Sequence, residues 1–502
     1  MSIGIIFGET DSFRFKVALT NSKSARRRDY VKVWHDPEGW VLCQIVKITR
    51  SNEKFSEESI FENEVVESPG DKVIAHVEVI GSRDEFGNLR LPMTPFSPGD
   101  KVFKADVQLI RKVLGLNDNG LYIGMLDGYN IPVYLDPNHI VQKHCSILAK
   151  TGSGKSYTAG VILEELLETG IPLLVIDPHG EYASLKFPTT DKKIERFNIR
   201  PKGFSSEVTV YSLPTSNNPD ADKTLRLDGE NLSATDIVKL IPDNLTSTQL
   251  GILYEAVNRL KKEGGQYNLE DIITEVANTQ SNVRWSVLAK LEQINESGLF
   301  SGRPTPMHAL FRDNHASVID MKGTSPELQQ VVTALVCERL FEYRKKNIVP
   351  PGMLVIEEAH NFCPERGFSR AVSSDVIRNI ASEGRKFGLG LMVISQRPAR
   401  IDKNVLSQCN TQIILRVTNP NDIQAITKGL EGITGNLVDD IKSLPTGVAV
   451  LSSSNIEFPI VVRIRPRRTK HGGESVRVVK HKSKKGVKKE GGGFFSKLFG
   501  TK

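Results

Sequence analysis

Residues 149–156, AKTGSGKS, limit the possible folds of this chain more than any other segment. Gly152 and Gly154 permit a tight turn whose backbone N–H groups can surround a polyphosphate, aided by the positive end of a following helix. Lys155 can reach the outer phosphates, and the hydroxyl of Ser156 can ligate Mg²⁺. The motif therefore predicts a P-loop that binds ATP with Mg²⁺. We expect nucleotide contacts from the consecutive residues Lys150, Thr151, Gly152, Ser153, Gly154, Lys155, Ser156 and Tyr157.

The segments on either side of this loop alternate between strand and helix patterns. An apolar run at 144–149 precedes the loop, residues 156–170 have apolar residues at helical spacing, and a second apolar run occupies 171–178. A strand, turn, helix and strand in this order predict a right-handed βαβ unit and a parallel sheet. The predicted fold class is therefore α/β, with a RecA-like P-loop ATPase core. Further runs rich in Val, Ile and Leu, typical of buried strands, lie at 353–360, 390–398, 411–417 and 447–453.

The chain divides by composition into five predicted segments. Short runs rich in Val, Ile and aromatic residues, broken by turn signals, predict a small β-barrel at the N-terminus. Several helical patterns between the two halves of the core predict an inserted helical bundle. A basic, glycine-containing end predicts a flexible tail. The segments are the barrel at 1–110, the first part of the core at 111–229, the bundle at 230–310, the second part of the core at 311–465 and the tail at 466–502.

The chain has a net charge of +7, and the position of that charge matters more than its size. Residues 470–502 contain ten Lys or Arg and two Glu, so the rest of the chain has a net charge of −1. DNA binding would therefore need a localised basic surface, such as loops lining a channel. We find no apolar run near the ~20 residues of a membrane span and no signal peptide. Five scattered cysteines without a CxxC pair fit a reducing compartment, so we expect a cytoplasmic protein with no membrane partner.

Two adjacent acidic residues, Glu357 and Glu358, end the apolar run that begins at 353. A carboxylate that ends a strand beside the P-loop strand can hold the water shell of Mg²⁺, and a second carboxylate can polarise the attacking water. We assign Glu357 to the metal together with Ser156, and Glu358 to the water. The pair predicts an ATP hydrolase, because nucleotide binding alone needs no water-polarising carboxylate.

Two other polar residues follow buried strands, and we expect them at the same edge of the sheet. Asp177 can orient Glu358 or the lytic water, or it can simply cap the next turn. Gln396 can contact the γ-phosphate and sense its loss, or it can stabilise its own loop. Both belong to the predicted catalytic set.

Arg385, in the segment SEGRKFG, completes the predicted catalytic set. An arginine offered to the ATP of a neighbouring subunit would stabilise the charge of the transition state. Lys386 and Arg416 are the alternatives for this role, and an ordinary surface position for Arg385 is the other interpretation.

Two loops are candidates for contact with DNA phosphates. The first, at 364–374, follows the catalytic carboxylates and contains Arg366 and Arg370, with small and hydroxyl residues between them. The second contains Arg400 and Lys403. An ordinary solvated surface is the alternative interpretation of both loops.

The predicted barrel together with AKTGSGKS, VIDPHGE, LVIEEAH and ISQRP resembles the HerA family of archaeal DNA translocases, within the FtsK–HerA superfamily. The resemblance spans nearly the whole chain, and VIDPHGE and the pairing of EEAH with SQRP are more specific than the P-loop alone. It implies a hexameric ring around duplex DNA, with ATP hydrolysed between subunits. It also implies a NurA-type nuclease and other end-resection proteins as partners in the repair of broken DNA ends. A basic residue before the P-loop strand contributes to the nucleotide site in this family, and Lys143 is the nearest match.

The sequence therefore predicts a ring-forming ATPase that translocates duplex DNA, with strand separation as a consequence of movement. One alternative is a ring ATPase that moves protein substrates or drives secretion or conjugation. A second is a clamp that uses ATP only as an assembly ligand. The effects of duplex DNA, single-stranded DNA and unfolded protein on the ATPase rate would distinguish these functions.

Overall fold

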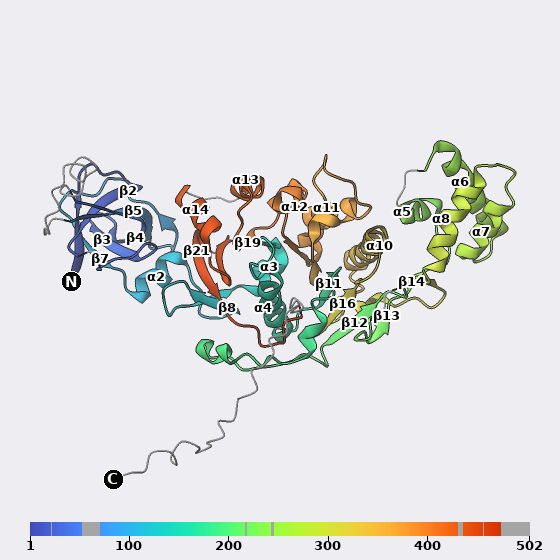
Figure 1. Cartoon of the computed structure of the whole chain (residues 1–502), viewed down its shortest axis with the longest axis horizontal. Coiled ribbons are helices and arrows are strands. Elements are labelled where there is room, and N and C mark those ends of the chain that lie inside the picture. Colours follow the sequence, from blue (N-terminus) through green and yellow to red (C-terminus); the bar gives the residue numbers. More distant parts are fainter. Residues whose placement is uncertain are drawn as a thin grey trace, which may run out of the picture. The chain divides into compact units, whose positions relative to one another are not determined.

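The structure, a computed structural model, describes residues 1–21, 23–52, 71–215, 218–241, 245–429, 435–454 and 456–472 (Figure 1). From the N-terminus these residues form a β-barrel, the first part of a large sheet with helices on its faces, a helical bundle and the second part of the sheet. Residues 473–502 of the predicted tail lie outside the described residues.

The N-terminal barrel is antiparallel. Its strands are β1 (Ser2–Phe7), β2 (Arg14–Leu19), β3 (Tyr30–His35), β4 (Gly39–Ser51), β5 (Lys72–Arg83), β6 (Leu89–Arg90) and β7 (Lys101–Lys104). The sheet closes because β2 pairs with β5 as well as with β1. Buried Phe15 and Val17 alternate with exposed neighbours along β2, as in a strand with one face in a core. The predicted N-terminal barrel is thus confirmed, and α2 (Val107–Leu114) follows it.

The second sheet is mixed. Its strands are β8 (Leu121–Leu126), β9 (Pro132–Leu135), β10 (Cys145–Leu148), β11 (Leu173–Asp177), β12 (Val208–Ser212), β13 (Lys223–Thr224), β16 (Ala316–Asp320), β17 (Gly352–Ile356), β18 (Leu389–Ser395), β19 (Thr411–Ile414), β20 (Val448–Ser453) and β21 (Ile456–Ile464). They lie in the order β13-β12-β16-β11-β17-β18-β10-β19-β20-β21-β8-β9. The pairs from β13 to β19 are parallel, which confirms the predicted parallel sheet. The pairs from β19 to β9 are antiparallel.

The antiparallel part follows from the path of the chain after β19. Two helices, α13 (Pro420–Gly429) and α14 (Gly435–Ser443), connect β19 to β20. Gly447, directly before β20, lines the same cavity as Gly152 and Gly154 of the P-loop. The chain therefore stays at the P-loop edge and does not cross back, so β20 runs opposite to β19. The apolar pattern of β20 predicted a buried strand but could not give its direction.

Helices cover both faces of the parallel strands. Every residue of β11 is buried, and its alternate residues enter two different cores. Leu173 and Val175 belong to the core that includes α4 (Lys155–Glu168), whereas Leu174 and Ile176 belong to the core of α10 (Pro326–Lys345) and α11 (Ser374–Glu383).

Within the described ranges, no helix is both long and apolar enough to cross a membrane. The shorter helices are α3 (Pro137–Lys143), η2 (Ala183–Lys186), η3 (Lys192–Phe197), α9 (Met307–Leu310), η4 (Ala359–Asn361), η5 (Gly384–Phe387), η6 (Pro398–Arg400) and α12 (Lys403–Ser407).

A helical bundle occupies the middle of the chain. Its helices are α5 (Ala234–Leu240), α6 (Ser247–Glu263), α7 (Leu269–Ala277) and α8 (Arg284–Glu296). Ser233, Thr246 and Asn268 form capping boxes that start the first three helices. Strands β14 (Leu227–Asp228) and β15 (Phe300–Ser301) pair with each other, so the chain enters and leaves the bundle side by side. The bundle has a hydrophobic core of its own, which includes Ile237, Leu253, Ile272 and Leu291.

Residues 465–472, which follow β21, pack against α4. The side chains of Arg465 and Arg467 are fully buried. Arg465 donates hydrogen bonds to Glu164 (3.0 Å) and Glu165 (2.8 Å) of α4. Buried carboxylates need cationic partners. In the predicted tail itself, the guanidinium of Arg467 lies 3.6 Å from Glu164, and the backbone N–H of Thr469 donates to the same carboxylate at 2.9 Å. The prediction of a flexible tail is therefore wrong for the described residues from 466 onward.

Candidate active site

The carboxyl ends of four adjacent parallel strands bring the predicted catalytic residues to one edge of the sheet. Asp177 ends β11, Glu357 and Glu358 follow β17, Gln396 follows β18, and the P-loop follows β10. These strands are neighbours in that order, so residues far apart in the chain lie side by side. Ligands of open α/β sheets bind in the crevice at this edge.

The backbone of the P-loop follows the path that its glycines permit. Gly152 and Gly154 have φ angles of +76° and +98°, where a Cβ would be strained. The backbone carbonyl of Arg416 accepts hydrogen bonds from the Lys150 N–H (2.9 Å) and from the buried Ser153 hydroxyl (3.2 Å). Ser153 therefore stabilises the loop. Arg416 lies at the P-loop edge of its own chain, which does not suit an arginine offered to a neighbour.

The ammonium group of Lys155 lies between the two predicted catalytic carboxylates. Its Nζ is 2.6 Å from Oε1 of Glu357 and also forms an ion pair with Oε1 of Glu358. The three side chains are at most 10% exposed. Burial alone would lower the pKa of Lys155, but the charges of Glu357 and Glu358 outweigh it and raise that pKa. Burial raises the pKa of Glu357, and Lys155 opposes this shift.

Tyr182, a residue that sequence reasoning missed, connects Asp177 to Glu357. Its hydroxyl donates to Oε2 of Glu357 at 2.5 Å, and its backbone N–H donates to Oδ2 of Asp177 at 2.9 Å. Oδ1 of Asp177 accepts from the backbone N–H of Gly180 at 2.8 Å. Burial raises the pKa of Asp177 to about 7. Asp177 thus caps the turn that places Tyr182, which favours the second of its two predicted roles. The available signal was the tyrosine directly after VIDPHGE.

Glu358 and Gln396 also contact polar groups on neighbouring segments. Oε2 of Glu358 lies 3.2 Å from Nδ1 of His360, and that nitrogen is 3.0 Å from the hydroxyl of Ser395. The Thr151 hydroxyl donates a hydrogen bond to the side-chain carbonyl of Gln396. The P-loop, the predicted γ-phosphate sensor and the predicted water-polarising residue therefore belong to one polar cluster. His360 was missed, although it follows the two glutamates in EEAH.

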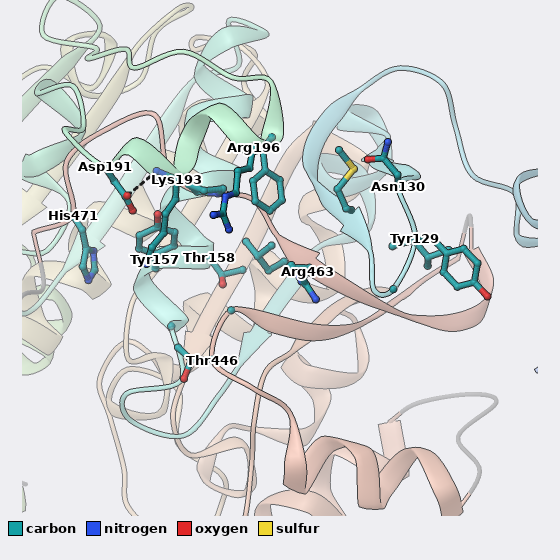
Figure 2. A pocket seen from close by; sticks show the side chains of 18 of the residues that line it. Tyr129, Asn130, Tyr157, Thr158, Asp191, Lys193, Arg196, Thr446, Arg463 and His471 are labelled. Carbon is teal, nitrogen blue, oxygen red and sulfur yellow. Dashed lines mark hydrogen bonds between the residues drawn. The ribbon is translucent and has the colours of Figure 1, made fainter. Parts of the chain in front are cut away.

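A cavity of about 940 Å³ opens beside the P-loop (Figure 2). The rings of Tyr157 and His471 stack edge to face 5.4 Å apart on one wall. In Figure 2, Arg196 lies between this pair and Asn130. The Tyr157 hydroxyl accepts a hydrogen bond from the Arg467 N–H (2.9 Å), which ties the wall to the C-terminal segment. An aromatic and basic cavity next to a phosphate-binding loop suits the base and ribose of a nucleotide.

Lys143 and Arg385 lie at the opposite edge of the sheet. Lys143 ends α3 just before β10, and Arg385 lies in η5 just before β18. The seven residues of β18, at a rise of roughly 3.3 Å each, separate Arg385 from the P-loop edge by about 20 Å. Within one subunit, therefore, neither side chain is placed to contact a nucleotide on the P-loop.

His144 connects the P-loop strand to the helix before Arg385. Its Nε2 donates to the carbonyl of Ala381 (3.0 Å), and its Nδ1 accepts from the N–H of Leu391 (2.9 Å). Burial is the main reason that the pKa of His144 falls to about 4, and the nearby Arg385 lowers it further. His144 thus fixes α11 and β18 against β10 while remaining neutral.

The two predicted DNA-contact loops are joined at the catalytic edge. The N–H of Glu365 donates to the carbonyl of Arg400 (2.8 Å), and Oε1 of Glu365 lies 3.0 Å from Nζ of Lys403. Arg366 and Arg370 are exposed, and within the described residues neither forms a hydrogen bond or an ion pair. Of the four predicted contacts, these two are the most available for an external anion.

Comparisons with known proteins agree with this arrangement. The family "Helicase HerA, central domain" matches residues 121–340, and the HAS barrel domain matches residues 3–85. The chain is 27% identical to the DNA double-strand break repair helicase HerA of Pyrococcus furiosus, with 92% of each chain covered. It is 29% identical to a probable DNA double-strand break repair helicase HerA of Methanocaldococcus jannaschii, covering 82% of this chain and 88% of the relative.

Among solved structures, the chain is similar to VirB4 of Thermoanaerobacter pseudethanolicus. The TM-score is 0.52 at 18% sequence identity, and the similarity covers 70% of this chain and 98% of VirB4. At this level of identity the similarity concerns the fold, and it agrees with a RecA-like P-loop core.

Proposed function

Because the chain belongs to the HerA helicase family, we propose that it is an ATP-driven translocase that moves along duplex DNA as a ring. The observation that supports this function most directly is the position of Lys155 between Glu357 and Glu358 at the carboxyl edge of the sheet. A cation at the P-loop with two carboxylates opposite is the arrangement that phosphoryl transfer to water requires.

Each of these groups has a separate role in hydrolysis. Lys155 moves from the carboxylates to the β- and γ-phosphates of ATP, because their negative charge replaces that of the glutamates. Glu358 is then available to orient and polarise the attacking water. Gln396, which already contacts Thr151 of the P-loop, is placed to sense the γ-phosphate.

The residues at the P-loop also fit Mg²⁺. The hydroxyl of Ser156 and the carboxylate of Glu357 are hard oxygen donors, which this ion prefers. Glu357 is 1% exposed and held by the Tyr182 hydroxyl, so its carboxylate is oriented in advance. When bound, the ion neutralises charge on the phosphates. Ser156 and Glu357 would hold it, directly or through water.

A ring places Arg385 at a second chain's ATP. Arg385 lies at the edge opposite its own P-loop, and Lys143 lies at the same edge. A head-to-tail ring in which this edge of one subunit faces the P-loop edge of the next would bring both side chains to the neighbour's nucleotide. We therefore propose a homohexamer with ATP bound between subunits, in which Arg385 completes the neighbouring site and Lys143 is a further contact there.

The proposed biological role is the resection of DNA ends at double-strand breaks. The name of the P. furiosus relative describes that protein as a DNA double-strand break repair helicase, and the M. jannaschii relative is named a probable one. We propose that this chain acts with a NurA-type nuclease, in the cytoplasm, and that Arg366, Arg370, Arg400 and Lys403 contact DNA phosphates. A ring ATPase that moves protein substrates or drives secretion or conjugation is the alternative function.

Displacement of a triplex-forming strand from duplex DNA tests the proposal. The wild-type chain with ATP should release a labelled third strand, and Glu358→Gln should not. Mass photometry of the same sample should give about six times the mass of one chain. Release without ATP hydrolysis, or no release by an active ring, would rule out translocation on duplex DNA.

A further inference from the structure

Phe368 is an exposed aromatic residue within a group of arginines. It lies in the loop between η4 and α11, and its side chain is 60% exposed. The nearby Phe362, at the base of the same loop, is completely buried. A single exposed apolar side chain is common and needs no explanation, so the surroundings of Phe368 must decide its role.

Those surroundings are cationic. The guanidinium of Arg400 lies 5.8 Å from the centre of the Phe368 ring. Arg366 and Arg370 flank Phe368 in the sequence, are exposed, and have no ionic or hydrogen-bonding partner among the described residues. The acidic side chain closest in sequence, Glu365, is already paired with a lysine. One guanidinium group therefore lies near the ring, and two further arginines of the same loop have no carboxylate partner among the described residues.

A cavity of about 420 Å³ lies against the same loop, and the two neighbours of Phe368 in the chain, Gly367 and Ser369, help to line it. It is lined by Arg366, Ser369, Arg370, Ser374, Asp375 and Arg378, together with two small residues. Arg378 is already paired with Asp375 (2.8 Å) and with another aspartate, so its charge and that of Asp375 offset each other. The two remaining arginines leave a net positive cavity with serine hydroxyls, which suits a phosphate group.

The base of the loop is fixed while its tip projects. Pro364 forms a β-bridge with Ile401, and the hydroxyl of Ser373 donates to the carbonyl of Phe362 (2.7 Å). Gly367, directly before Phe368, has a φ of +102°, which allows the sharp turn of the tip. The loop begins a few residues after Glu358, so the tip is attached to the catalytic edge by a short, anchored segment.

We propose that this loop is a cradle for one nucleotide unit of a DNA strand. The phosphate enters the cavity between Arg366 and Arg370, and the ring of Phe368 packs against the sugar or base of the same unit. This inference rests on the proposed function and adds that each subunit holds one strand of the duplex. Arginine alone would bind phosphates on either strand, whereas an aromatic contact in register with one phosphate selects a single backbone.

Substitution of Phe368 separates this contact from general attraction to phosphate. Phe368→Leu retains an apolar side chain but removes the aromatic face. It should weaken binding of duplex and of single-stranded DNA by at least about fivefold, given the energy of aromatic stacking on a base. Because no charge is lost, the slope of log affinity against log salt should not change. Phe368→Tyr should restore the affinity, and Phe86→Leu, at an exposed phenylalanine of the barrel, is the matched control.

Methylphosphonate patches test the choice of strand. A neutral patch on one strand of the duplex should abolish stimulation of the ATPase, and the same patch on the other strand should not. Three results would each overturn the cradle. The two patches could have equal effects, Phe368→Leu could bind DNA with wild-type affinity, or that variant could have an altered assembly mass. If duplex DNA does not stimulate the wild-type ATPase at all, the proposed function has failed instead.

Discussion

Lys155, Glu357 and Glu358 bring one positive and two negative charges into a nearly buried space. Each partner depends on the others, because an unpaired buried charge costs several kcal/mol. The consequences of substitution therefore differ among the three residues, although all belong to one cluster.

Lys155→Ala should abolish ATP hydrolysis and weaken nucleotide binding, because it removes the cation from the β- and γ-phosphates. It also leaves Glu357 and Glu358 without their shared partner, so the thermal midpoint should fall. Turnover and binding of a fluorescent ATP analogue measure the two functional effects. Near-normal turnover in this variant would disprove the P-loop assignment.

Glu358→Gln should have a different effect. The change is nearly isosteric and keeps Glu357 for the metal, so ATP should still bind while hydrolysis slows by at least about a hundredfold. Single-turnover measurements with bound ATP test this directly. A variant that loses ATP binding but not hydrolysis of the residual complex would show that the roles of the two glutamates are reversed.

At the scale of elements, the sequence predicted those helices and strands whose formation depends on local residue patterns. The apolar runs and the P-loop predicted the parallel strands and the edge where Asp177, Glu357, Glu358 and Gln396 meet, because carboxyl ends of adjacent parallel strands share one edge. Periodicity could not show that β20 runs antiparallel, since strand direction depends on the path of the connection. Nor could composition show that Arg465 is buried, because its partners lie in a helix about 300 residues earlier in the chain. Tyr182 was missed because only the fold brings its hydroxyl to Glu357. His360 was missed although the segment EEAH already places it two residues after Glu358.

His144 joins three elements, and its pKa predicts a dependence of stability on pH. The pKa in the folded chain is about 4, below the ~6.5 of an unfolded histidine, so protonation favours the unfolded chain. The stabilisation is therefore complete above pH ~6.5 and is lost as the pH falls toward 4, by up to about 3 kcal/mol. His144→Asn retains a side chain that can donate and accept hydrogen bonds, and it cannot titrate. The thermal midpoint of the wild type should fall more than that of the variant between pH 7 and 4.5. Parallel curves would contradict this role.

The two loops proposed to contact DNA predict a change in the salt dependence of binding. Replacing both Arg366 and Arg370 by Ala should weaken duplex binding about equally for all sequences. Each lost phosphate contact should lower the slope of log affinity against log salt by roughly 0.9. Fluorescence anisotropy at several salt concentrations measures this slope. Unchanged affinity would place the DNA surface elsewhere, with Arg400 and Lys403 as the next residues to test.

At the scale of the whole molecule, the two edges of the sheet have different roles. The P-loop, the carboxylates and Gln396 occupy one edge, and Arg385 and Lys143 occupy the other. In the proposed ring, one chain would therefore supply two incomplete halves of a site. This arrangement explains why the proposed enzyme needs a ring.

Linked dimers test whether Arg385 acts on a neighbour. Arg385→Ala should reduce turnover by roughly 10³ while leaving ATP binding intact. When Arg385→Ala and Lys155→Ala are in the same subunit beside a wild-type partner, each interface contains one altered residue. When they are in separate subunits, both alterations can fall on one interface and leave the other intact. The two arrangements should therefore differ in activity. Equal activities would transfer the role to Lys386.

The ATPase rate in the presence of different polymers is the most direct test of the central claim. Turnover of the purified full-length chain should be measured alone, with duplex DNA, with single-stranded DNA and with an unfolded protein. Glu358→Gln and the double variant of Arg366 and Arg370 to Ala serve as controls. Stimulation by duplex DNA, lost in both variants, is the predicted result. Stimulation by unfolded protein with no response to duplex DNA would contradict the account.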